Sequence, residues 1–157
     1  MAPPVARGQL AVAAAASRRL VSEPTQTSPV SGAEARHQMA NLLHTYTEIA
    51  DRKDIEAAVA VLSRARVTFP TGGFDRPEDA EAFFIQLWRS HVPHRHDVSN
   101  LIVEPAADGT WRATAHYCRW MFQPEPLLHT LGAYELIAEA TSWTISELTV
   151  TRAWSQG

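Results

Sequence analysis

The strongest constraint on the fold is a change of hydrophobic period near the middle of the chain. Between residues 39 and 88 apolar residues recur every three or four positions, and after residue 95 they alternate with polar ones. This change predicts three helices before Pro93 and then four long strands, at about 95–104, 111–122, 127–139 and 143–154. Since the joints between these strands are short, neighbouring strands should pair antiparallel. We predict an α+β domain with three helices packed on one face of a curved antiparallel sheet.

Local signals place the boundaries of this domain. Ser31 and Glu34 fit a capping box at the start of the first helix, and Asp75 and Pro77 mark the start of the third. VTF at 67–69 is typical of a short strand, and Gly72–Gly73 of a plain turn. The predicted domain covers 31–157.

Residues 1–30 are predicted to form a disordered tail, because they are rich in Pro, Ser, Thr and Ala and hold no aromatic residue. The run LAVAAAA within them weakly resembles the apolar core of a signal peptide. A single cysteine, Cys118, excludes an intrachain disulfide and fits a reducing compartment, so we expect a cytoplasmic protein.

Composition excludes several classes of function. The net charge of −3 leaves no basic face for nucleic acid, and no apolar run approaches the roughly 18–20 residues of a membrane span. The chain has no glycine-rich phosphate loop, nucleophile elbow or zinc signature. We therefore expect no nucleic-acid partner and no membrane partner.

Alternation along the strands predicts which side chains line a pocket. His96, Val98, Asn100 and Ile102 should share one face of their strand, a mixture that suits a small-molecule pocket. On the next strand the better pocket wall carries Tyr117, Arg119 and Met121, with His116 and Trp120 on the outer face. An inward Arg119 would need a carboxylate from the protein or from a ligand, and otherwise lies at the mouth in water.

Three fragments resemble a known family: YTEIADRKD at 46–54, HDVSN at 96–100, and LGAY at 131–134 followed by SW and a terminal AWSQG. In order and spacing they are similar to the SnoaL-like branch of the nuclear transport factor two-like superfamily, over residues 33–157. The resemblance implies a cone-shaped α+β barrel around a central pocket. Members include polyketide cyclases, ketosteroid isomerase, scytalone dehydratase and pure binding modules, so the resemblance predicts the fold better than the reaction.

The resemblance also implies site residues. Asp51 and His96 match the acid–base pair of scytalone dehydratase, whereas Leu136 stands where the branch often has an aspartate. The alternative is that Asp51 caps the second helix and His96 is a satisfied core histidine. The substrate-binding residues are predicted to be Tyr46, Phe69, Trp88, Asn100, Tyr117, Met121, Tyr134 and Leu136.

A metal site would use His91, His94 and His96, but no carboxylate has a clear ligand spacing and Pro93 disturbs the geometry. We therefore predict no metal and no cofactor, with His91 and His94 as solvated loop residues.

The expected function is that of a cofactor-free enzyme of secondary metabolism, a cyclase, isomerase or dehydratase acting on a hydrophobic, polyketide-like molecule. One variant is a pericyclase that closes a ring by shape alone. The alternative from another class is a non-catalytic ligand-binding or assembly module. Because a bent sheet leaves one face uncovered, we also expect a homodimer or homotrimer.

Overall fold

A computed structural model of the chain describes residues 29 to 156, so the tail predicted at 1–30 lies outside the described residues except for its last two positions. Helices α1 (Gly32–Arg52) and α2 (Ile55–Leu62) are followed by strands β1 (Arg66–Phe69) and β2 (Gly72–Phe74) and then by helix α3 (Ala80–Leu87). Four long strands follow: β3 (His94–Pro105), β4 (Thr110–Phe122), β5 (Pro126–Glu139) and β6 (Ile145–Ser155). None of the described helices is long and apolar enough to cross a membrane.

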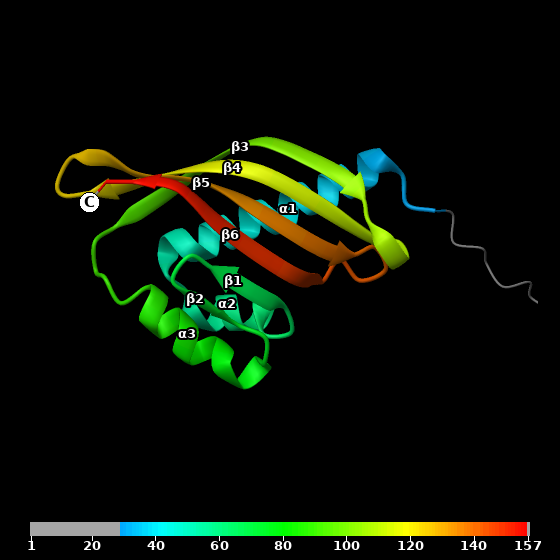
Figure 1. Cartoon of the computed structure of the whole chain (residues 1–157), viewed down its shortest axis with the longest axis horizontal. Helices are drawn as coiled ribbons and strands as arrows, with labels where there is room; N and C mark the ends of the chain where they lie inside the picture. Colours follow the sequence, from blue (N-terminus) through cyan, green and yellow to red (C-terminus); the bar gives the residue numbers. More distant parts are fainter. Residues whose placement is uncertain (1–28, 157) are drawn as a thin grey trace, which may run out of the picture.

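The α+β class is confirmed, with three helices packed on a six-stranded mixed sheet in the order β2-β1-β6-β5-β4-β3. Strands β3 to β6 form the predicted antiparallel meander, and β1 adds to β6 in parallel. Helix α1 lies across the meander, while α2 and α3 lie beside β1 and β2 (Figure 1). Since β2 and β3 are both edge strands, the sheet stays open and does not close into a barrel.

Strand β2 corrects the prediction of a plain turn at Gly72–Gly73. These glycines pair with Phe69 and Thr68 of β1, and a Cβ atom on Gly73 would lie 2.0 Å from the Val67 carbonyl oxygen. A three-residue strand with two glycines has no readable alternation, because glycine has no side chain to place on either face.

Helix α1 begins where Ser31 and Glu34 predict, whereas α3 begins at Ala80, after a 3-10 turn at Pro77–Asp79. The Ser31 hydroxyl accepts the Glu34 main-chain N–H at 3.1 Å at the start of α1. Asp54 caps α2 by accepting the Ala57 N–H at 3.0 Å. Since Asp54 holds the cap of α2, the alternative role considered for Asp51 is already taken, and its carboxylate is free to bind elsewhere.

A β-bulge in β3 changes the predicted facing of its second half. Ser99 pairs with His116 and Ile102 with Thr114, so two residues of β3 stand opposite the single Ala115. Asn100 takes a left-handed backbone conformation at φ 56°, which asparagine tolerates better than most residues. The side chains of Asn100 and Ile102 therefore lie exposed, and the prediction that both face the pocket was wrong.

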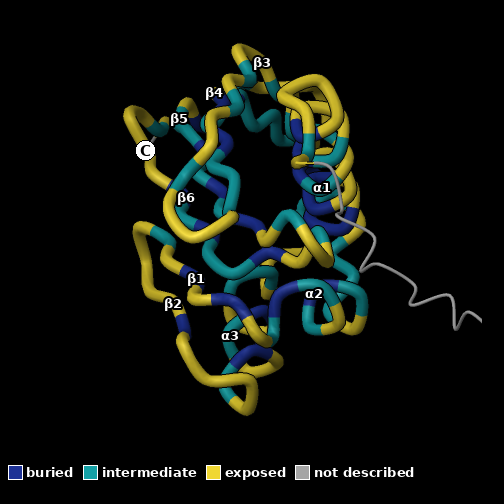
Figure 2. Tube along the Cα trace, turned by 90° about the vertical axis from the view of Figure 1, so that its right-hand side faces the viewer, coloured by how far each residue is buried: buried dark blue, intermediate teal, exposed yellow. Residues whose placement is uncertain are grey.

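The buried residues lie between α1 and the sheet, and around α2 and α3 (Figure 2). The core holds Met39, Leu43 and Ile49 of α1, Phe84 of α3, and the inward side chains of β4, β5 and β6.

Candidate active site

A cavity of about 540 Å³ lies between the helices and the inner face of the sheet. Its volume falls in the range that holds a drug-sized ligand. All three tyrosines of the chain line it. Six of the predicted substrate-binding residues are in its wall: Tyr46, Phe69, Trp88, Tyr117, Met121 and Tyr134.

Two of the predicted substrate-binding residues are elsewhere. Asn100 lies on the outer face of the sheet, beside His116, because the bulge turns it outward. Leu136 faces inward as predicted, but it is fully buried in the core between Ala113 and Leu148 and does not reach the cavity.

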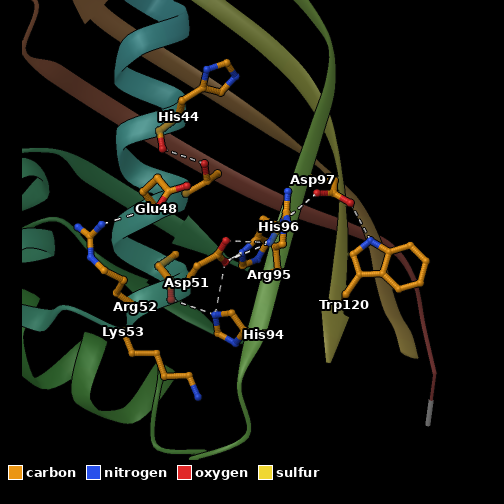
Figure 3. A network of polar contacts seen from close by, with 12 residues as sticks. His44, Glu48, Asp51, Arg52, Lys53, His94, Arg95, His96, Asp97 and Trp120 are labelled. Atoms are coloured by element: carbon orange, nitrogen blue, oxygen red, sulfur yellow. Dashed lines mark hydrogen bonds and ion pairs between the residues drawn. The ribbon is translucent and has the colours of Figure 1, made fainter. Parts of the chain in front are cut away.

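Asp51 and His96 are in direct contact, as predicted. Asp51, in the last turn of α1, places Oδ1 2.6 Å from the ring Nδ1 of His96 on β3 (Figure 3). Both carboxylate oxygens also lie 3.1 Å from the His96 main-chain N–H. His96 lines the cavity and Asp51 does not, so the carboxylate holds the imidazole from behind.

This geometry selects one tautomer of neutral His96. A carboxylate accepts hydrogen bonds, so Nδ1 carries the hydrogen and Nε2 keeps its lone pair. Within the described part of the chain, Nε2 has no hydrogen-bond partner. An imidazole with a free Nε2 and a carboxylate on Nδ1 is suited to take a proton from a bound molecule, because the carboxylate stabilises the resulting imidazolium.

His94 is a functional-site residue that the sequence analysis missed. It is 9% exposed, lines the cavity, and its Nε2 lies 2.9 Å from the carbonyl oxygen of Ala50. The prediction of a solvated loop residue was wrong because β3 begins directly after Pro93. Burial, and secondarily His96, lower the pKa of His94 from 6.5 to about 4, so its ring is neutral at pH 7. His91 is exposed, as predicted.

The tyrosines form an aromatic wall next to His96. The rings of Tyr117 and Tyr134 stack with centroids 4.6 Å apart, and Tyr46 meets Tyr134 edge-on at 5.9 Å. The His96 ring lies 5.7 Å from that of Tyr117. Burial raises the pKa of Tyr46 and Tyr134 well above 10, so both hydroxyls stay protonated and can donate hydrogen bonds to a ligand.

Lys53 holds the loop that leads into β3. It ends α1 in a left-handed conformation at φ 53°, and its Nζ donates to the carbonyl oxygens of Ser90 and, at 2.7 Å, Val92. This tether connects the end of α1, which carries Asp51, with the start of the strand that carries His96. A left-handed lysine has no sequence signal of its own.

Asp51, His94 and His96 could also be considered as metal ligands, since their candidate ligand atoms lie within 4.8 Å of one another. Asp51 supplies the carboxylate that no local spacing predicted. However, His96 Nδ1 donates to Asp51, and His94 Nε2 must donate to the Ala50 oxygen, since a carbonyl only accepts. Neither of these two nitrogens then offers a lone pair to an ion, so an ion would have to use His96 Nε2 and His94 Nδ1. The contacts of the three side chains are those of a hydrogen-bond network.

A model of the SnoaL-like domain matches residues 31–149. The chain belongs to the SnoaL-like family. Solved structures agree on the fold of this SnoaL-like protein. A proposed aromatic ring hydroxylase from Novosphingobium aromaticivorans is 16% identical with a TM-score of 0.67, over 80% of this chain and 93% of the other.

Two further solved structures share this fold. ActVI-ORFA from Streptomyces coelicolor is 13% identical with a TM-score of 0.65, over 74% of this chain and 96% of its own. A proposed scytalone dehydratase from Novosphingobium aromaticivorans is 11% identical with a TM-score of 0.62, over 76% of this chain and 85% of its own. No curated protein matches the chain by sequence. At these identities the likeness of the solved structures shows a shared fold and no more.

Proposed function

We propose that this SnoaL-like protein catalyses a proton-transfer reaction, a cyclisation, isomerisation or dehydration, on a small molecule with an extended ring system such as a polyketide. His96 takes and returns the proton at Nε2. Asp51 orients the ring and stabilises its charged form. One observation carries the proposal, namely the Asp51 carboxylate bound to both Nδ1 and the main-chain N–H of a histidine that lines the cavity.

The remaining lining fits a ring system that carries oxygens. The stacked pair Tyr117 and Tyr134 offers a flat apolar surface, with Phe69, Trp88 and Met121 on other parts of the wall. The hydroxyl of Tyr46 is a protonated donor close to the same rings, and it could stabilise the negative oxygen that forms when a proton leaves a carbon next to a carbonyl.

The proposal is tested by exchange of substrate hydrogen for deuterium. A panel of aromatic ketones and polyketide-like diketones is incubated with the protein in deuterium oxide, and NMR follows incorporation next to the carbonyl. Since proton removal at carbon precedes isomerisation and aldol-type ring closure, exchange detects either reaction. We expect His96→Ala and Asp51→Asn each to lower the rate by about 10²–10⁴-fold. The double variant should be little slower than either single one, since the two residues act as a unit.

His116→Ala is the matched control, since His116 is exposed on the outer face of the same sheet. This variant should catalyse deuterium exchange into the substrate at the wild-type rate. A loss smaller than about tenfold in His96→Ala, with turnover that depends on the size of Tyr117 or Met121, would indicate the shape-driven pericyclase instead. Binding of panel members without any exchange or turnover would indicate the non-catalytic binding module.

A further inference from the structure

The cavity carries an uncompensated positive charge. Lys53, Arg89, Arg119 and Arg152 line it, and no aspartate or glutamate does. Elsewhere among the described residues five arginines pair with carboxylates, as Arg112 does with Glu135 at 2.7 Å. Over residues 29–156, none of the four cavity cations forms an ion pair.

Arg119 is the deepest of these cations with unused hydrogen-bonding capacity. Lys53 is engaged by two carbonyl oxygens, while Arg89 and Arg152 are exposed at the mouth. The Nη2 of Arg119 lies 2.9 Å from Nδ1 of His129, and its Nε is buried with no partner in the described structure. Burial and the nearby arginine lower the pKa of His129, so its ring is a neutral acceptor that orients the guanidinium without balancing its charge.

A partly buried guanidinium without a counter-ion is unfavourable unless an anion joins it. Arginine pairs best with planar, two-oxygen anions, to which it donates two parallel hydrogen bonds. No described protein carboxylate can reach it in this cavity, so the counter-ion has to come from a bound molecule.

Arg119 is also the residue directly opposite His96 in the β3–β4 pair. Side chains at opposed positions of an antiparallel pair start about 5 Å apart, so an anion held by Arg119 lies next to the ring of His96. The stacked Tyr117 and Tyr134 adjoin both, since Tyr117 precedes Arg119 by two positions on the same face of β4.

We propose that the substrate of this cavity is a carboxylic acid on a planar ring system. Its carboxylate pairs with Arg119, its rings lie against Tyr117 and Tyr134, and the position that loses a proton to His96 lies within a few bonds of the carboxylate. This assignment of a substrate class rests on the proposed function, although the binding site itself stands without it.

The test compares 2-naphthoate with its neutral counterpart 2-naphthamide by isothermal titration calorimetry on the full chain. The wild-type protein should bind the acid at least about tenfold more tightly than the amide, the usual worth of a hydrogen bond to a charged group. Arg119→Met should lose about 10–100-fold in affinity for the acid and change little toward the amide. Arg95→Met is the matched control, because Arg95 lies exposed on the outer face beside Asp97 and should bind both probes as wild type.

Two further measurements separate a binding role from a structural one. Arg119→Met should unfold at the wild-type temperature or above it, since it removes a charge that the folded chain does not balance. Arg119→Lys keeps the charge but not the planar pair of donors. This variant should fold, and its ratio of affinity for the acid over the amide should fall to about half of the wild-type ratio or less. Equal wild-type affinities for the two probes, including no binding of either, would overturn the proposal. So would a preference for the acid that survives in Arg119→Met, or a fall of many degrees in its melting temperature.

The exchange rate reports on the pair Asp51 and His96, whereas the ratio of the two affinities reports on Arg119. A failure of the deuterium-exchange experiment would therefore leave the carboxylate site standing, and equal affinities for the acid and the amide would leave the acid–base proposal standing.

Discussion

His94 shows what burial does to a single titratable residue in this site. It is enclosed by the end of α1 and by His96, with Asp51 3.9 Å from its Nε2 and the cationic Lys53 and Arg119 nearby. Burial is the largest influence and holds its pKa at about 4, so the folded chain takes up no proton there at pH 6.

We therefore predict that His94 makes the protein sensitive to acid. The unfolded chain protonates this histidine at about pH 6.5 and the folded chain only at about 4, so below pH 6.5 the unfolded state binds more protons. The stability that the folded chain has with a neutral His94 is fully present above pH 6.5 and is lost as the pH falls toward 4. Between pH 7 and 4.5, this residue should lower the free energy of unfolding by about 2–3 kcal/mol.

Urea unfolding at both pH values measures this effect, with His94→Gln as the comparison. The variant should be less stable at pH 7 but show a smaller loss on acidification. A variant with the same pH dependence as the wild type would show that His94 is not the group responsible.

The cluster of Asp51, His94 and His96 leads to a second prediction at this scale. Because both imidazoles use a nitrogen as hydrogen-bond donor, a chelator should change neither the melting temperature nor the exchange rate. Elemental analysis of protein purified without chelator gives the direct measurement. One equivalent of zinc or iron, absent from His94→Gln, would make these three residues ligands.

At the scale of elements, Gly132 explains how the aromatic wall is built. Gly132 of β5 pairs with Tyr117 of β4, and an added Cβ atom would lie 2.6 Å from the Tyr117 ring and 2.1 Å from the Thr151 carbonyl oxygen. The missing side chain lets the Tyr117 ring lie across β5, with its hydroxyl 3.3 Å from that same oxygen. The glycine of the LGAY fragment thus permits the stacking of Tyr117 on Tyr134.

We predict that Gly132→Ala destabilises the fold by about 1–3 kcal/mol, the usual cost of overpacking, and displaces the Tyr117 ring. Thermal unfolding and titration with 2-naphthamide measure the two effects. Gly32→Ala is the control, since a Cβ atom there meets nothing within 4 Å. If Gly132→Ala bound the amide with wild-type affinity, the absence of a side chain at Gly132 would not be needed for the aromatic wall.

The strands show which features of an element can be predicted from the sequence and which cannot. The long strands were predicted to within a few residues, because alternation over ten or more positions is unambiguous. The bulge at Asn100 was not predicted, because it inserts one residue without breaking the apolar pattern of the strand. After the bulge, Leu101 and Val103 lie on the inner face in place of Ile102. Asn100 and Ile102 were misplaced for that reason.

At the scale of the whole molecule, the change from helical to strand period was enough to predict the fold class. The site was predictable only in part. Asp51 and His96 are 45 residues apart, and their pairing came from the resemblance to a family, not from local spacing. The roles of His94 and Lys53 depend on how the end of α1 meets the start of β3, which no local pattern encodes.

The outer face of the sheet leads to the prediction of a homodimer. Leu131 and Trp154 pair across β5 and β6 and are 36% and 46% exposed, next to Cys118 and Trp120 of β4. A contiguous apolar area on an uncovered sheet favours association with a second copy. Light scattering at micromolar concentration should give twice the chain mass, and Trp154→Glu should halve it. A wild-type monomer at these concentrations would contradict this prediction, as would a dimer unaffected by Trp154→Glu.

The central claim is that Asp51 fixes His96 with its hydrogen on Nδ1 and its free Nε2 toward the cavity. Nitrogen-15 NMR of histidine-labelled protein, with His96 assigned by the spectrum of His96→Ala, measures this without knowledge of the substrate. For the neutral ring, we predict a protonated Nδ1 and an unprotonated Nε2, and a mixture of tautomers in Asp51→Asn. A neutral His96 that carries its hydrogen on Nε2, or a spectrum that Asp51→Asn leaves unchanged, would contradict the account.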